Sequence, residues 1–275
     1  MRNITAFLLV VFISGSAKAY SSEIFPSDEL RPYRAGFGLG CSFAGLRDEI
    51  ESPINRYVNA LTGLIDGNIQ KGIFFHSLYI NFFMGSSKMP APYRGYNKNQ
   101  YISARGFLEY ALDCRLWGNE IFPGFLGGSL RTCFSYTGVG GINSGNNDLL
   151  AAPTGVMLTS ADVHLTQKWI INRRNSVDLS LEYPLLGYGI RPAYAGFDEL
   201  WMKYLYENAL KIATLGKFIS FHNYWAVYGE LKYHYKITPL ISPYSCLGFE
   251  LFRINFPRPR VEALFQVNAG IAFTF

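Results

Sequence analysis

A hydroxyl, an imidazole and a carboxylate occur at short spacing between His164 and Glu182. His164 and Thr166 are two residues apart, so their side chains would point to the same face of a β-strand. Glu182 lies on the next expected strand, where it could stand beside His164. A hydroxyl activated by a histidine that a carboxylate orients is the arrangement used for acyl transfer. The alternative interpretation is a polar network that packs the interior of the protein.

The other reactive residue types form no pattern of this kind. The four histidines, at 76, 164, 222 and 234, show no HExxH spacing, so we expect neither a metal site nor a cofactor. His222, in the stretch FHNYW, has no serine two residues further on. The glycines of GFGLG at 36–40 lack the Lys-Ser/Thr of a phosphate loop, and we expect them to relieve crowding inside a strand.

The elements that would position these side chains are β-strands. Residues 101–117 alternate between an apolar face and a face that carries Ser103, Arg105, Glu109, Asp113 and Arg115. Seventeen residues is long for a strand of a soluble sandwich, where about five or six is typical. A tilted strand of a membrane barrel has this length and this alternation.

Further strands are expected along the rest of the chain. With the final stretch that ends at Phe275 they make ten, and the others are 33–45, 57–68, 72–86, 101–117, 124–137, 160–171, 176–186, 217–237 and 241–255. The stretch 57–68 has the weakest pattern and could instead be a short helix. We predict an all-β fold, a single antiparallel transmembrane barrel of ten strands, with eight or twelve strands as alternatives.

Short and long connections alternate along these strands. Short turns are expected at 70–72, 118–124, 172–175 and 237–240, on the periplasmic side, and long links at 46–56, 87–99, 138–158 and 189–216 on the other. Both strands beside the turn at 172–175 have even-numbered inward residues, which requires a loop of odd length. Lys168 would then face Asp178, and His164 would face Glu182.

Inward-facing charges of both signs are expected to pair and to fill a narrow lumen, because a barrel of eight to ten strands has an interior that side chains largely fill. The predicted network consists of Arg105, Glu109, Asp113, Arg115, Arg131, Asp162, Lys168, Asp178, Glu230 and Lys232.

The beginning of the chain has the form of a secretion signal. Arg2 precedes the apolar run ITAFLLVVFIS, and Ala17 and Ala19 flank Lys18 as in a signal-peptidase site. We expect residues 1–19 to be a signal peptide and 20–275 to be the barrel domain. Cleavage would lower the formal charge from +5 to +3 by removing Arg2 and Lys18. So mild a charge argues against nucleic-acid binding.

The chain is 16% aromatic and only 16% charged, whereas about 25% charged residues is usual. A secreted chain with this composition suits a membrane barrel, and a soluble secreted β-sandwich is the competing interpretation. The four cysteines, Cys41, Cys114, Cys133 and Cys246, are scattered, and we expect mostly free thiols.

The C-terminal strand resembles the assembly signal of Gram-negative outer-membrane β-barrels, with Ile271, Phe273 and Phe275 on one face. The resemblance implies insertion by the outer-membrane assembly machinery and residence among outer-membrane lipid and lipopolysaccharide. The stretch LEYPLLGYGIRPAY at 181–194 also resembles uncharacterised outer-membrane barrels of the Bacteroidota, a group that implies no activity.

His164, Thr166 and Glu182 are also similar to the His-x-Ser pair and neighbouring Glu of barrels that deacylate lipid A. Here, however, Thr replaces Ser, Gln167 replaces the expected Asn, and parity turns the trio inward. We therefore expect a non-enzymatic barrel with a structural, surface-interaction or narrow-passage role, and a lipid A deacylase-like hydrolase as the alternative. Residues 197–217 could form an outer helix or lid that binds at the surface.

Overall fold

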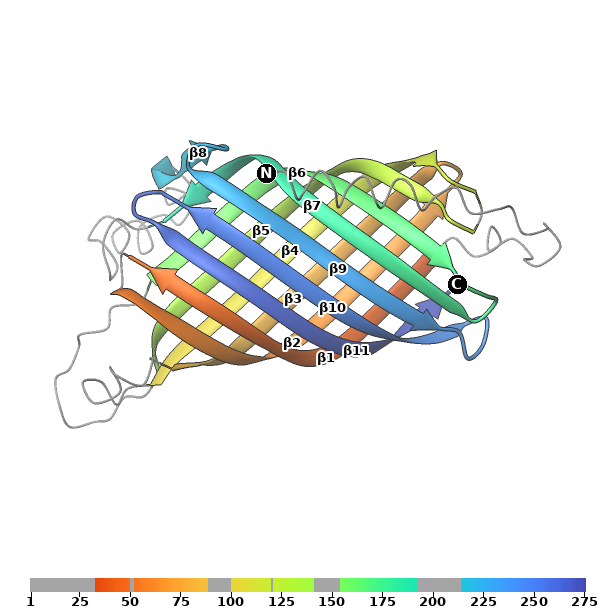
Figure 1. The fold of residues 1–275 in the computed structure, drawn as a ribbon, viewed down its shortest axis with the longest axis horizontal. Helices are drawn as coiled ribbons and strands as arrows, with labels where there is room; N and C mark the ends of the chain where they lie inside the picture. Colours follow the sequence, from red (N-terminus) through yellow and green to blue (C-terminus); the bar gives the residue numbers. More distant parts are fainter. Residues whose placement is uncertain (1–32, 50–51, 89–99, 120, 141–153, 192–213) are drawn as a thin grey trace, which may run out of the picture.

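A computed structural model describes residues 33–49, 52–88, 100–119, 121–140, 154–191 and 214–275. Almost all of them lie in β-strands (Figure 1). The strands are β1 (Tyr33–Asp48), β2 (Ser52–Lys71), β3 (Phe74–Lys88), β4 (Gln100–Trp117), β5 (Gly124–Gly140), β6 (Thr154–Ile170), β7 (Asn175–Ile190), β8 (Lys217–Ile219), β9 (Tyr224–Tyr235), β10 (Ile241–Ile254) and β11 (Arg260–Thr274). Among the described residues, no helix has the length and hydrophobicity that a membrane crossing requires.

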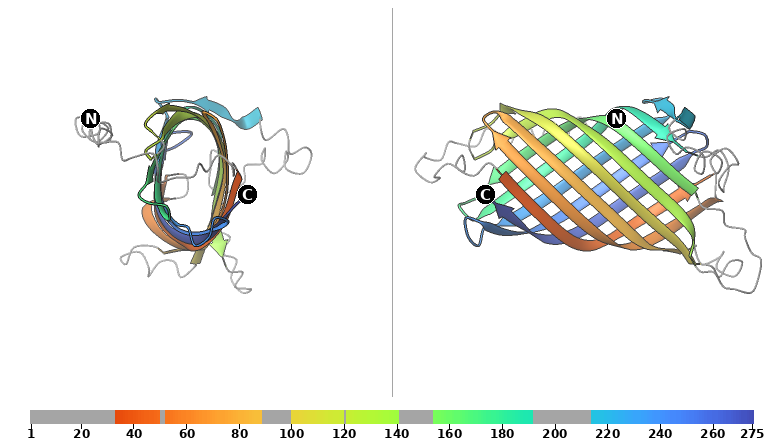
Figure 2. Two further views of the ribbon diagram at one scale, coloured as in Figure 1. Left: turned by 90° about the vertical axis from the view of Figure 1, so that its right-hand side faces the viewer. Right: turned by 180° about the vertical axis from the view of Figure 1, so that it is seen from behind.

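Ten of these strands close into an antiparallel barrel. The order is β6-β5-β4-β3-β2-β1-β11-β10-β9-β7, and β7 pairs with β6 to complete the circuit. The first strand pairs with the last along its length, from Arg34 opposite Thr274 to Asp48 opposite Arg260. The predicted ten-strand antiparallel barrel is therefore confirmed. Seen end-on, it is oval rather than circular (Figure 2).

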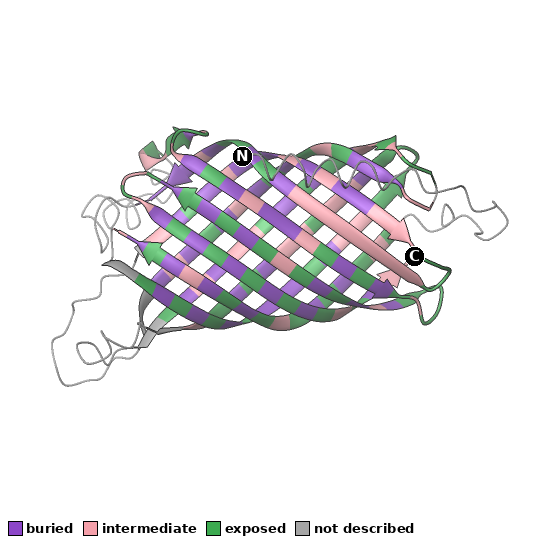
Figure 3. Cartoon of the chain, viewed as in Figure 1, coloured by how far each residue is buried: buried purple, intermediate pink, exposed green. Residues whose placement is uncertain are grey.

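The two faces of the wall differ as the alternation predicts. Buried and exposed residues alternate along the strands (Figure 3). Large apolar side chains face outward, among them Leu61 at 73% exposure and Leu39 at 72%. Aromatic residues share this outer face, including Phe43, Phe134 and Phe265. An exposed apolar surface that surrounds the molecule is far larger than the patches that soluble monomers tolerate, and it suits contact with lipid.

The two ends of the barrel carry different connections between strands. Both Tyr33 and Phe275 lie at one end, the terminal end, together with four short turns after β2, β4, β6 and β9. Gly72 and Gly118 supply positive φ angles of 59° and 84° in two of these turns. The other end, the loop end, carries the links after β1 and β10. The positions of the four turns predicted from the sequence are confirmed.

Several predicted boundaries are wrong. The strand predicted to begin at 160 begins at Thr154, and the one predicted to end at 186 continues to Ile190. The link at 46–56 is short, because β1 continues to Asp48 and β2 begins at Ser52. The strand predicted at 217–237 is interrupted after β8, where the carbonyl of Ser220 accepts the N–H groups of Asn223 and Tyr224. His222 is exposed in this turn. The stretch 57–68 is strand, as counted, and is not the alternative helix.

Several expectations fall outside the described residues. The signal peptide at 1–19, most of the link at 87–99, residues 141–153 of the link at 138–158, and residues 192–213, which include most of the suggested outer helix, lie there.

The glycines at 36, 38 and 40 allow a close approach inside the wall of the barrel. A Cβ at Gly40 would lie 2.0 Å from the carbonyl oxygen of Val267, and one at Gly38 would lie 2.7 Å from the hydroxyl of Tyr244. Gly36 and Gly38 thus leave room for Tyr244, which is buried, and Gly40 allows close approach of the β11 backbone. Their expected role of relieving crowding within a strand is confirmed.

An apolar cluster lies against one side of the interior near the loop end. It joins residues of β6, β8, β9 and β10: Val156, Leu158, Ile219, Tyr224, Ala226, Tyr228, Phe252 and Ile254. Ile219 is only 1% exposed. The short strand β8, which pairs with β7, therefore contributes a buried side chain to this cluster. Charged side chains are also buried in the interior, both beside this cluster at the loop end and toward the terminal end.

Candidate functional site in the barrel lumen

The hairpin between β6 and β7 has the predicted register. His164 lies opposite Glu182, and Lys168 lies opposite Asp178. The loop between the paired residues Ile171 and Asn175 contains three residues, the odd length that parity requires. Matching inward faces on adjacent strands fix this register.

The imidazole of His164 has a different carboxylate partner from the one expected. Its Nδ1 lies 2.7 Å from Oδ2 of Asp113 on β4, and its Nε2 lies 3.5 Å from the hydroxyl of Thr166. The Thr166 hydroxyl also lies 3.3 Å from that of Ser180. All four residues face the lumen. The hydroxyl, the imidazole and a carboxylate therefore do meet, but Asp113 rather than Glu182 stands at Nδ1.

Glu182 belongs instead to a group centred on Arg131 of β5. One guanidinium nitrogen of Arg131 donates to Glu182 at 2.7 Å and also to Glu109. The Nε of Arg131 lies 4.0 Å from the carboxylate of Asp162. The plane of the guanidinium lies over the ring of Tyr228, 3.8 Å from its centroid. A single cation thus stands among three buried carboxylates, a group that we call the central cluster, together with His164 and Asp113.

A second group spans the lumen nearer the loop end. Arg105 on β4 donates to Glu250 on β10 and, at 2.7 Å, to Glu262 on β11. Strands β4 and β10 are five places apart in the ten-strand circuit, so this contact crosses the full width of the barrel. Side chains of opposite walls therefore meet inside the barrel.

The same group continues to the loop end. Arg260 donates to Glu262 at 3.0 Å and to Asp48 at 3.2 Å. Arg191 completes it with a further bond to Asp48. Three arginines and three carboxylates therefore alternate in one chain, which we call the alternating chain: Arg191, Asp48, Arg260, Glu262, Arg105 and Glu250.

A third group lies toward the terminal end. The ammonium of Lys232 lies 2.9 Å from Glu230 and 3.5 Å from Asp66. Asp178 lies 3.6 Å from the ring of His234. Lys168 lies over the ring of Phe75, 3.9 Å from its centroid. An interior cavity of about 100 Å³ lies between this group and the central cluster, lined by His164, Glu182, Lys168 and Lys232 among others.

The structure distributes the sequence-selected residues unevenly. Arg115 lies at the terminal end, where it donates to the carbonyl of Gly118 at 3.4 Å rather than to a carboxylate. The other nine residues of the predicted network are buried or half-buried in the interior. Sequence reasoning left several participants out of the network: Arg34, Asp48, Asp66, Arg191, His234, Glu250, Arg260 and Glu262. Glu262 and His234 could have been found, because each lies on the polar face of an alternating strand.

All four cysteines are free thiols, and Cys133 and Cys246 are buried. The Sγ of Cys133 lies 3.2 Å from the Nε of Arg105, which adds a soft acceptor to the alternating chain. The thiols therefore contribute to packing rather than to covalent closure.

Comparison with solved structures agrees with this architecture. The outer membrane protease OmpT from Escherichia coli aligns with 93% of this chain and 100% of its own, at 9% identity and a TM-score of 0.51. The fold is that of the outer-membrane β-barrels. At such low identity the likeness concerns the fold alone and carries no activity to this chain.

The translocator domain of the autotransporter NalP from Neisseria meningitidis aligns with 100% of this chain and 95% of its own, at 8% identity and a TM-score of 0.41. No family model matches the sequence, and no curated protein matches it. The narrower resemblance to barrels of the Bacteroidota finds no support in these comparisons.

Proposed function

We propose that this protein is an integral outer-membrane barrel whose lumen is closed by ion pairs, and that it serves a structural or surface-interaction role rather than a catalytic one. The observation that carries the proposal is the contact of Arg105 with Glu250, which joins opposite walls of the barrel. An ion pair across the width obstructs solute passage, and the apolar cluster under the loop end adds a second obstruction.

Planar-bilayer recording tests the closed lumen. The purified protein is expected to give little or no steady conductance. A double variant, Arg105→Ser with Glu250→Ser, shortens both side chains at the crossing and leaves Glu262 paired with Arg260. We expect conductance to rise in this variant. Arg47→Ser with Glu49→Ser is the matched control, because that ion pair is exposed.

Large, stable single-channel steps from the unaltered protein would contradict the closed lumen. Conductance that rose equally in the control pair would also contradict it, because the change would then not arise at the crossing.

The location in the outer membrane is supported by the apolar outer face and by the position of the last strand. Ile271 and Phe275 face outward, at 39% and 63% exposure, and Phe273 stacks on Phe37 with ring centroids 6.3 Å apart. We propose that these residues address the chain to the assembly machinery, after a signal peptide has been removed behind Ala19. Outer-membrane lipid and lipopolysaccharide would then be its surroundings. Membership of a Bacteroidota barrel group, suggested by residues 181–194, remains part of this proposal.

Assembly can be tested at the end of β11. Phe275→Ser is expected to reduce the folded protein in the outer-membrane fraction, measured by heat-modifiable migration on gels. Phe134→Ser removes a lipid-facing Phe of similar exposure, 53%, from a strand in the wall and is the matched control. Normal assembly of Phe275→Ser would contradict the role given to the terminal residue.

A second function has one observation in its favour, the sequence of contacts from Thr166 through His164 to Asp113. These groups suit acyl transfer, but they face the lumen, whereas lipid acyl chains would lie against the outer face. Mass spectrometry of lipid A from cells with and without the protein tests the hydrolase. An unchanged profile is expected, and a shortened lipid A that reverts in Thr166→Ala would favour the hydrolase instead.

A further inference from the structure

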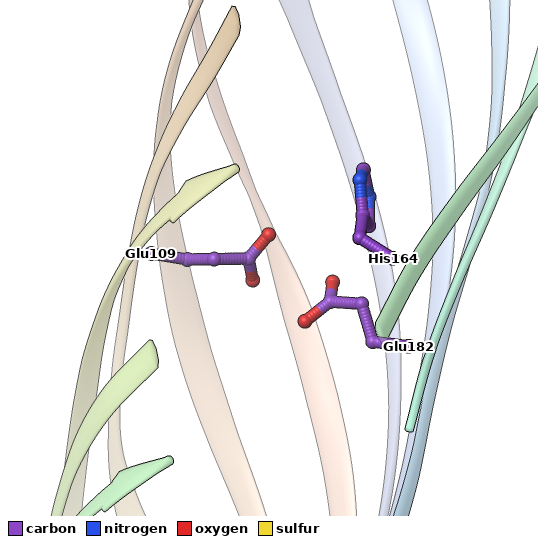
Figure 4. A group of neighbouring side chains, drawn as sticks. All are labelled: Glu109, His164 and Glu182. Atoms are coloured by element: carbon purple, nitrogen blue, oxygen red, sulfur yellow. The ribbon is translucent and has the colours of Figure 1, made fainter. Parts of the chain in front are cut away.

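Three potential metal ligands converge in the central cluster. Glu109, His164 and Glu182 come from β4, β6 and β7, and each offers a ligand atom within 4.8 Å of those of the other two. Figure 4 shows the two carboxylates facing each other across a narrow gap, with the imidazole beside them. All three residues are buried. One imidazole and two carboxylates form a ligand set that suits zinc and related divalent ions.

The charges around these ligands do not balance. Four carboxylates, those of Glu109, Asp113, Asp162 and Glu182, are at most 7% exposed. Arg131 forms ion pairs with three of them, Glu109, Glu182 and Asp162, and Asp113 lies at the ring of His164. Even a protonated His164 would leave an excess of negative charge. Buried charges without matching partners are costly, so this cluster favours a further positive charge.

Asp162 offers Arg131 an alternative partner when a further cation binds in the cluster. The side chain of Asp162 has 0% exposure, and neither carboxylate oxygen has a hydrogen-bond partner within 3.5 Å. The Nε of Arg131 likewise lacks a partner and lies 4.0 Å from this carboxylate. A small movement of the guanidinium would form that bond. Arg131 could then release Glu109 and Glu182 without becoming an unpaired buried cation.

Two further features prepare the site. Oδ2 of Asp113 accepts a hydrogen bond from Nδ1 of His164. Carboxylates orient metal-binding histidines in this way. Glu109, His164, Glu182 and Arg131 all line the interior cavity of about 100 Å³. Its volume accommodates an ion together with a water molecule.

We propose that Glu109, His164 and Glu182 bind one Zn²⁺ ion in the lumen, and that Arg131 occupies the site in the absence of metal and moves to Asp162 when zinc binds. The proposal does not depend on whether the lumen conducts. It gives two residues of the trio suggested for acyl transfer, His164 and Glu182, a different role, with Glu109 in place of Thr166.

Metal content of the folded protein tests the site. The full chain is refolded in detergent with Zn²⁺ and desalted, folding is verified by heat-modifiable migration, and the zinc is measured by elemental analysis. One zinc per chain is expected. Glu182→Gln, which keeps the side-chain volume, and His164→Ala are each expected to lower zinc affinity at least tenfold. His76→Ala is the matched control, because that histidine lies outside the cluster beside Tyr110.

Replacing Arg131 is expected to change zinc affinity in the opposite direction from replacing a ligand. Arg131→Met removes the competing cation and is expected to raise zinc affinity at least tenfold. Asp162→Asn removes the alternative partner of the guanidinium and is expected to lower affinity several-fold. Cobalt in place of zinc gives visible d–d absorption that reports ligand geometry, and the spectrum is expected to change in His164→Ala and to stay unchanged in His76→Ala.

The absence of zinc from the folded protein would overturn the proposal, since protons rather than a metal would then neutralise the carboxylates. So would equal zinc content in Glu182→Gln, His164→Ala and the unaltered chain. If His164→Ala does not fold, His164→Gln and the Glu182→Gln result decide between these outcomes.

Discussion

The alternating chain and the central cluster lie in one lumen and use the same residue types, but they differ in charge. In the alternating chain, three arginines meet three carboxylates in strict succession from Arg191 to Glu250. In the central cluster, Arg131 alone serves Glu109, Glu182 and Asp162. A balanced network is a structural closure that loses stability when any member is removed. An unbalanced one is a place where an added cation stabilises the fold.

Removal of a cation from the balanced network is expected to have the largest effect on stability. Arg105→Met leaves Glu250 without its arginine and Glu262 with only Arg260, and the side chain of Arg105 is 2% exposed. Loss of one partner of a buried ion pair costs about 3–5 kcal/mol. The free energy of unfolding in detergent, measured by denaturant titration, should fall by this order. Arg253→Met, at an outward position beside Asn255, is the control and should change little.

Neutralising one carboxylate in the alternating chain and one in the central cluster should change the free energy of unfolding by different amounts. Glu262→Gln weakens two ion pairs of the alternating chain and is expected to cost about 2 kcal/mol, in the range for hydrogen bonds to charged groups. Asp162→Asn relieves the negative excess of the central cluster and is expected to cost less than about 1 kcal/mol, or to stabilise the barrel. Both are measured by the same unfolding titration. Equal losses in the two variants would mean that the charge comparison is mistaken.

The smallest effect is expected at an exposed pair. Arg47 and Glu49 lie 3.2 Å apart with side chains 49% and 35% exposed. Arg47→Gln should change the free energy of unfolding by less than about 0.5 kcal/mol, because water and salt screen such pairs. A loss comparable with that of Arg105→Met would show that burial does not set the strength of these contacts.

Sequence reasoning succeeded where a contact depends on neighbouring strands. Alternation gave the facing of each strand, and the three-residue loop then placed His164 opposite Glu182. Contacts across the lumen could not be predicted in this way. Alternation indicates which side chains point inward, but it does not give their position along the barrel axis or the residues that lie opposite them across the lumen. The pairing of Arg105 with Glu250 depends on closure over ten strands, and that of His164 with Asp113 joins strands two places apart. No spacing in the sequence indicates that Glu109, His164 and Glu182 converge, for the same reason.

The interruption after β8 shows a second limit. The stretch from Ser220 to Asn223 contains neither Gly nor Pro, the residues that most often signal a turn. The turn is made instead by local hydrogen bonds, in which the side chain of Asn223 accepts the N–H of Ser220 at 3.0 Å. Such a turn is visible only when the packing of Ile219 in the interior is known.

The β6–β7 pairing contains one extra residue whose effect reaches the end of the strand. Pro184 lies opposite Asp162 and Leu186 opposite Ala161, so Leu185 is inserted and both leucines are exposed. Even-numbered side chains point inward before the insertion, and odd-numbered ones do so after it, which turns Arg191 toward Asp48. The number of residues in β7, rather than their types, therefore decides whether the side chains after Leu185 point inward or outward. Deletion of Leu185 would turn Arg191 outward, away from Asp48, without substituting any residue of the alternating chain.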